Sequence, residues 1–187
     1  MNRIKAKLFT TAFLAILLTF FGGESLAYYQ VLGTAENVVT SGNIRFMIHE
    51  TTDQGTEFPA EGVYVLPGDV VSKRVTIENK CEHPFYLRVK MVSGTNSREL
   101  TAEECLKINI NQEFWELYDG WYYYKGILSP EETTPYVFSQ VEIVGEEVDN
   151  RYIGSALSLS VRAQALQSEN NPTTDGKAYT ASGWPQE

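Results

Sequence analysis

The fold is decided by one stretch of the sequence, "GDVVSKRVTIENKCEHPFYLRVKMVSG", which spans residues 68–94. Apolar side chains share one alternating face in each half of it: Val71, Val75 and Ile77, then Phe85, Leu87, Val89 and Met91. A period of two predicts a strand that turns one face toward a core. The Pro67-Gly68-Asp69 turn precedes the first half, so the stretch predicts two consecutive strands.

The same alternation continues outward in both directions. "GNIRFMIHE" at 42–50 predicts an earlier strand, and five later segments predict further ones: 106–110, 114–118, 121–127, 136–144 and 155–166. Asp119-Gly120 is the strongest hairpin signal in the chain. Thr101 and Glu104 predict a capping box on one short helix. We therefore predict an all-β fold, an antiparallel β-sandwich of jelly-roll type with about eight strands.

The N-terminus has the three parts of an export signal: a basic start, a short apolar run and a cleavage site with small residues. Arg3, Lys5 and Lys7 precede an uncharged run at 8–21, and Ser25 and Ala27 offer small residues before a cut between Ala27 and Tyr28. That run is shorter than the roughly 20 residues of a membrane span. We expect a secreted protein, either extracellular or associated with the cell surface. An uncleaved N-terminal anchor is the alternative.

The remaining chain divides into three parts. We expect an extended N-terminal segment at 28–42, a β-sandwich domain at 43–168 and a polar, loosely ordered tail at 169–187, where Tyr179 and Trp184 could dock. Residues 28–187 hold 12 basic and 23 acidic side chains, because four of the chain's 15 basic and 24 acidic residues lie before the cut. This charge disfavours nucleic acid and anionic lipid as partners, and we expect no stable membrane span in the mature form.

Several stretches resemble the TasA/camelysin family of secreted Gram-positive proteins, which are substrates of a dedicated signal peptidase. The junction is similar at Gly22-Gly23 and Ala27-Tyr28-Tyr29, and so is "NVVTSGNIRFMI" at 37–48. Three longer segments are similar as well, at 63–91, 119–143 and 157–170. The resemblance implies a jelly-roll subunit of extracellular biofilm fibres, with copies of itself or related matrix subunits as partners.

In that family, the N-terminal segment of one subunit completes a sheet in the next. The resemblance therefore implies an assembly strand here, with Tyr29, Val31 and Leu32 as apolar anchors, since an unpaired sheet edge can template another chain. The alternative is that this segment pairs within its own domain. An accessory subunit that joins the fibres of another protein is a further possibility.

No catalytic or cofactor motif is present. "HETTD" at 49–53 places Asp53 where a zinc-protease helix needs its second histidine, and neighbouring strand residues point to opposite faces. The adjacent acidic pairs, such as Glu103-Glu104, are typical of solvated turns. We therefore expect neither an enzyme, nor a metal site, nor a cofactor.

Cys81 and Cys105 both survive the predicted cut, and export permits a disulfide between them. Such a bridge would contribute about 3 kcal/mol in the chain-entropy model. Two free, half-buried thiols are the alternative.

The hairpin around Asp119-Gly120 carries the densest aromatic group of the chain. Trp115, Trp121, Tyr122 and Tyr124 form a candidate aromatic surface. Such residues stabilise antiparallel pairs without any ligand, and when exposed they also stack on sugars or on a neighbouring subunit. The competing function is therefore a monomeric binding module that places this hairpin on a wall or host glycan.

Overall fold

The fold is described from a computed structural model of the 187-residue chain. It describes residues 29–37, 44–96, 101–144 and 156–185, and for 29–37 it describes the backbone. The strands are β1 (Tyr29–Asn37), β2 (Phe46–Thr51), β3 (Val63–Val65), β4 (Val70–Ser72), β5 (Arg74–Asn79), β6 (Phe85–Thr95), β7 (Leu106–Ile110), β8 (Trp115–Tyr118), β9 (Trp121–Tyr124), β10 (Phe138–Ile143) and β11 (Ala156–Gln167). The helices are α2 (Ala102–Cys105) and the short 3-10 helix η2 (Ala178–Thr180).

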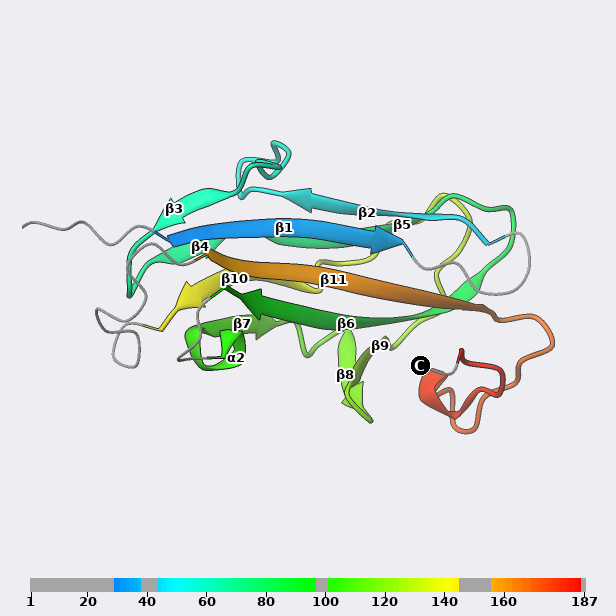
Figure 1. The fold of residues 1–187 in the computed structure, drawn as a ribbon. Coiled ribbons are helices and arrows are strands. Elements are labelled where there is room, and N and C mark those ends of the chain that lie inside the picture. The colour runs from blue at the N-terminus through cyan, green and yellow to red at the C-terminus, as the bar shows by residue number, and fades with distance from the viewer. Residues whose placement is uncertain (1–28, 38–43, 97–100, 145–155, 186–187) are drawn as a thin grey trace, which may run out of the picture.

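The strands form three sheets (Figure 1). The largest has six strands in the order β3-β1-β11-β6-β9-β8, the second has the order β4-β10-β7, and β2 pairs with β5 in the third. Every pair is antiparallel except β1 with β11. The prediction of an all-β, mostly antiparallel fold is confirmed, while the jelly-roll connectivity stays a prediction.

The core lies between the six-stranded sheet and the two smaller sheets. Its buried side chains come from all three, for example Leu159 on β11, Val141 on β10 and Ile77 on β5, each fully inaccessible to solvent. On β5 the buried positions alternate with less buried ones, as the sequence pattern predicts. No helix within the described ranges is long and apolar enough to cross a membrane.

The strand expected in the first half of residues 68–94 is divided in two at Lys73. Before this residue β4 pairs with β10, and after it β5 pairs with β2, so the chain passes from one small sheet to the other. The Lys73 N–H donates to the Ser139 carbonyl (3.1 Å), and its side chain is fully buried. Strands that change sheets at such a corner are a feature of β-sandwiches.

Both local signals in the sequence formed the structures expected of them. Asp119 (φ 46°) and Gly120 (φ 76°) join β8 to β9 with positive φ at both central positions, as a type I′ hairpin requires. At the start of α2, the Thr101 N–H donates to Glu104 Oε2 (2.8 Å), which is the return half of the capping box.

Candidate functional site

The N-terminal strand β1 lies between β3 and β11 in the six-stranded sheet, and we call this position the β1 seat. Along one edge it pairs in parallel with β11, from Gln30 opposite Ala156 to Asn37 opposite Ala163. Along the other edge β3 pairs with Tyr29, Gln30 and Val31 alone. In this structure the assembly strand therefore pairs within its own chain, which is the second of the two alternatives that the sequence left open.

The expected anchors lie at the start of this seat. Tyr29 is opposite Val65, Val31 lies between Val63 and Leu157, and Leu32 is opposite Ser158. The predicted cleavage residues Ala27 and Tyr28 lie outside the described residues. The seat is bounded on one side by an eleven-pair ladder between β11 and β6, and on the other by the three-residue strand β3.

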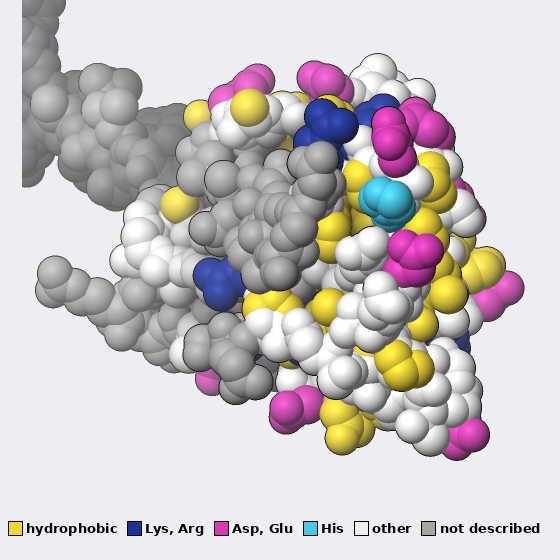
Figure 2. All heavy atoms as spheres, turned by 90° about the vertical axis from the view of Figure 1, so that its right-hand side faces the viewer, with side chains coloured by type: hydrophobic (Ala, Val, Ile, Leu, Met, Phe, Trp, Pro, Cys, Tyr) yellow, Lys and Arg dark blue, Asp and Glu magenta, His cyan; other side chains and the backbone are white. Residues whose placement is uncertain are grey.

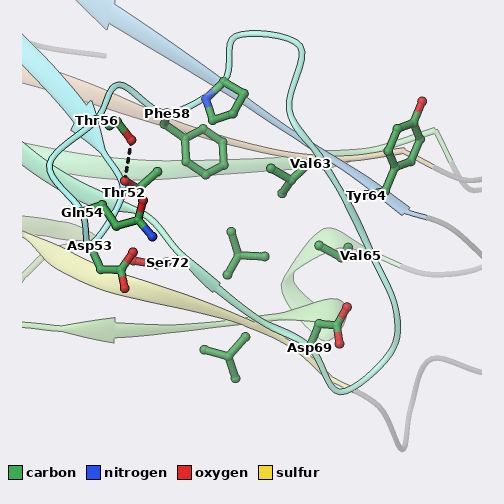
Figure 3. A pocket seen from close by; sticks show the side chains of 13 residues that line it. Thr52, Asp53, Gln54, Thr56, Phe58, Val63, Tyr64, Val65, Asp69 and Ser72 are labelled. Atoms are coloured by element: carbon green, nitrogen blue, oxygen red, sulfur yellow. Dashed lines mark hydrogen bonds between the residues drawn. The ribbon is translucent and has the colours of Figure 1, made fainter.

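A groove of about 400 Å³ opens between β3, the edge strand of the six-stranded sheet, and β4, the edge strand of the three-stranded sheet (Figure 3). β3 and β4 form two of its walls, and the loop at 52–59 forms the third. Its apolar surface consists of Phe58, Val63, Val65, Val70 and Val71. Asp53 and Asp69 are its acidic residues, and Thr52 and Thr56 share a hydroxyl hydrogen bond of 2.8 Å at its rim. Of these apolar residues Val70 is well exposed, whereas Val65 and Phe58 are buried in the floor of the groove.

The expected aromatic surface is wrong for three of its four residues. Trp115 and Tyr124 lie in the main core, 1% and 9% exposed, with ring centroids 5.4 Å apart. Trp121 is 4% exposed because Arg88 and the C-terminal segment cover it. Tyr122 is partly buried against the core. The hairpin therefore has the structural role that the sequence allowed.

The expectation of a loosely ordered C-terminal tail is wrong for residues 174–185, which are docked on the body. Residues 174–185 dock on the six-stranded sheet, and Ala178 and Ala181 are buried there together with Trp121 and Tyr123. The polar composition of the tail conceals this, because its contacts depend on two alanines and the two aromatic residues Tyr179 and Trp184. The central residue of the contact is Arg88, and it was not identified from the sequence as a contact residue. The one indication in the sequence is a charged side chain within an alternating strand.

The two cysteines are free buried thiols, so the alternative to a disulfide is the one found. Cys81 Sγ donates to Asn79 Oδ1 (2.9 Å), and Cys105 Sγ donates to the Thr101 carbonyl (2.8 Å). Each thiol is thus a local hydrogen-bond donor at the end of a strand or helix.

Several titratable groups of the described residues form ion pairs with one another. His49 Nε2 lies 2.8 Å from Glu78 Oε2, and Lys80 binds the other oxygen of Glu78. The hydrogen bonds from Lys80 and then His49 lower the pKa of Glu78 below its usual value. Within the described ranges, no three His, Cys, Asp or Glu residues are grouped as a metal site would need. Figure 2 shows acidic side chains spread around one end of the molecule, not gathered at one point.

A buried charge, Lys73, lies in the core. Lys73 Nζ is 3.1 Å from Glu50 Oε1 and donates to the Leu159 carbonyl at 3.3 Å, with the Phe58 ring centroid 4.9 Å away. Burial lowers the pKa of Lys73, and the Glu50 carboxylate opposes that shift. This pair joins β2 to the corner between β4 and β5, so we assign it a structural role.

Comparisons with protein-family models, with curated proteins and with solved structures find no match for this chain.

Proposed function

We propose that this chain is a secreted structural subunit that assembles into extracellular fibres by exchanging β1 between copies. In the single chain, β1 fills the seat between β3 and β11. In a fibre, β1 of one subunit fills the same seat in the next. The family resemblance around residues 22–48, 63–91, 119–143 and 157–170 supports this proposal.

The observation that carries the proposal is the pairing of β1. All its described backbone partners lie on β3 and β11, and residues 38–43 separate it from the rest of the domain. β1 follows directly on the expected cut after Ala27. It could therefore leave its position between β3 and β11 without displacing another strand. Exchange of an identical terminal element between subunits is a low-cost route to association.

The energetic balance of the exchange is simple. The β1 contacts are the same whether the strand comes from the same chain or from a neighbour, so they favour neither state. Closing the strand onto its own chain has the advantage of an intramolecular reaction, while the exchanged state gains from subunit concentration. Exchange in one direction from subunit to subunit is a head-to-tail association, which grows open-ended filaments.

The competing glycan-binding function has less support. It needs an exposed aromatic platform, but Trp115, Trp121 and Tyr124 are buried. Tyr118 is the exposed aromatic residue of the hairpin at 52%, and it already stacks on Tyr179 at 4.3 Å.

The test compares two chains, one that begins at Tyr28 and one that begins at Asn43. We expect electron microscopy of concentrated solutions to show filaments from the first and none from the second. A synthetic peptide of residues 28–39 should then bind the shorter chain and block its incorporation into filaments of the longer one. Filaments from the chain that begins at Asn43 would contradict strand exchange. A chain that forms no filaments alone but joins those of another matrix protein would be an accessory subunit.

A further inference from the structure

The segment that follows β11 folds on itself before it reaches the sheet. The N–H groups of Lys177, Thr180 and Ala181 donate to the carbonyls of Thr174, Lys177 and Ala178 (2.9–3.2 Å). The Trp184 indole N–H donates to the Ala178 carbonyl (3.0 Å), which closes a compact loop. The backbone of this segment is thus bonded largely internally, and its side chains together with the Pro185 carbonyl make its contacts with the body.

Arg88 is the centre of those contacts. This residue is 7% exposed on β6, and its guanidinium carbon lies 4.4 Å from the Trp121 ring centroid and 4.7 Å from that of Trp184. The guanidinium is therefore stacked between one indole of the body and one of the segment. Arginine suits this position because its planar cation stacks on aromatic faces while its edge still donates hydrogen bonds.

The donors of Arg88 bind both the body and the segment. Nε and Nη2 donate to Gln164 Oε1 (2.8 and 2.6 Å), and Nη1 donates to the Tyr123 hydroxyl (2.9 Å). Nη2 also donates to the Pro185 carbonyl (2.8 Å). The body thus orients the guanidinium so that one edge and one face receive a Trp-Pro unit.

Two further contacts fix the other end of the segment. Lys177 Nζ lies 2.8 Å from Glu116 Oε2, and the resulting ion pair raises the pKa of Lys177. The Tyr179 ring stacks on Tyr118 at 4.3 Å with an angle of 12° between the planes. The surface formed by β6, β8, β9 and β11 therefore contacts four features of the segment in sequence order: a cation, a small residue, an aromatic ring and a Trp-Pro unit.

We propose that this surface of β6, β8, β9 and β11 is a peptide-binding site, filled here by the chain's own C-terminal segment and able to take the same segment from a second copy. Its recognition uses side chains of β6, β8, β9 and β11, so it does not depend on a covalent link to β11. Apart from Gln164 on β11, the side chains of this surface lie on strands that are separated from β1 by β11 in the sheet order, so peptide binding and strand exchange use different contacts.

The test starts from the full chain. A specific protease sequence replaces residues 172–173, and cleavage then leaves residues 174–187 held by their contacts alone. We expect the cleaved segment to co-elute with the body in gel filtration of concentrated protein. A labelled synthetic peptide of residues 174–187 should replace it saturably.

Variants on both sides of the contact make the test specific. Arg88→Lys in the body loses the stacked, forked donor and should weaken peptide binding at least about tenfold. Trp184→Ala in the peptide should weaken it by a similar or larger factor without touching the fold of the body. Tyr179→Phe, which keeps the stacked ring, and Met47→Ala on β2 are matched controls that should change little.

Two results would overturn the proposal. One is a cleaved body that keeps its urea unfolding midpoint but neither retains the segment nor binds the labelled peptide. The other is peptide binding of equal strength for the wild-type and Trp184→Ala peptides, which would make the binding non-specific.

Discussion

Among single residues, Lys73 is the most unusual, because its charge is fully buried and paired with Glu50. An amphipathic strand pattern gives no reason to place a lysine in the core, and Lys73 is nonetheless fully buried. It bridges β2 and β11 through Glu50 Oε1 and the Leu159 carbonyl. A buried ion pair adds little net stability compared with apolar residues, but the loss of one partner leaves a charge without compensation.

We predict that Lys73→Met destabilises the fold by about 3 kcal/mol, because it leaves the Glu50 carboxylate buried without its cation. The double variant Lys73→Met/Glu50→Gln should recover much of that loss, since neither charge remains. Urea unfolding of the two variants and the wild type measures both effects. A single variant as stable as the wild type would show that the pair does not organise the corner.

The carboxylate of Glu78 provides a pH prediction. Its pKa is lowered in the folded chain by Lys80 and His49, so the unfolded chain binds its proton first as the pH falls. The stabilisation is present above the unfolded value of 4.5 and is lost as the pH falls through the folded pKa. We therefore expect the stability difference between wild type and Glu78→Gln to shrink on acidification from neutral pH. The matched control is Glu57→Gln at an exposed carboxylate, and an equal, pH-independent difference for both variants would contradict the assignment.

At the scale of elements, most strands could be predicted because burial imposes its period on the sequence. The strand β5 follows its alternation residue by residue, and the β8–β9 hairpin follows from Asp119-Gly120. β3 was missed because three residues are too few to show a period. The break at Lys73 was missed because the alternation passes through it, and only the change of pairing partner reveals the corner.

The hairpin turn gives a prediction at this scale. Gly120→Ala should cost about 1 kcal/mol, because φ of 76° is strained for a residue with a Cβ atom. Asp119→Asn is the control, since asparagine tolerates the left-handed region. Thermal unfolding of both variants checks this. Equal melting temperatures for Gly120→Ala and wild type would contradict the type I′ assignment.

For the whole molecule, the sequence pattern did not determine which parts of the fold β1 and the C-terminal segment pack against. An extended segment pairs through backbone groups that every chain has, so the pattern of 28–42 predicts a strand without naming its partner. The tail is polar overall, and its docking depends on Arg88, which lies far away in sequence at the centre of a strand. Both ends therefore needed the assembled sheet, in which β1 pairs with β11 and the C-terminal segment packs against side chains of β6 and β9.

Strand exchange requires the seat between β3 and β11 to accept β1 from a neighbouring subunit, and the backbone pairing of Thr34 with Ser160 provides a direct test. Cysteines at these two positions, in a chain with Cys81→Ser and Cys105→Ala, lie within disulfide reach across strands about 4.8 Å apart. Unlabelled and ¹⁵N-labelled chains that begin at Tyr28 are mixed, assembled at high concentration and then oxidised. Strand exchange predicts disulfide-linked peptide pairs that combine one light and one heavy strand in the filaments, and only same-label pairs in dilute monomer. Filaments whose cross-linked pairs are all of one label would contradict it.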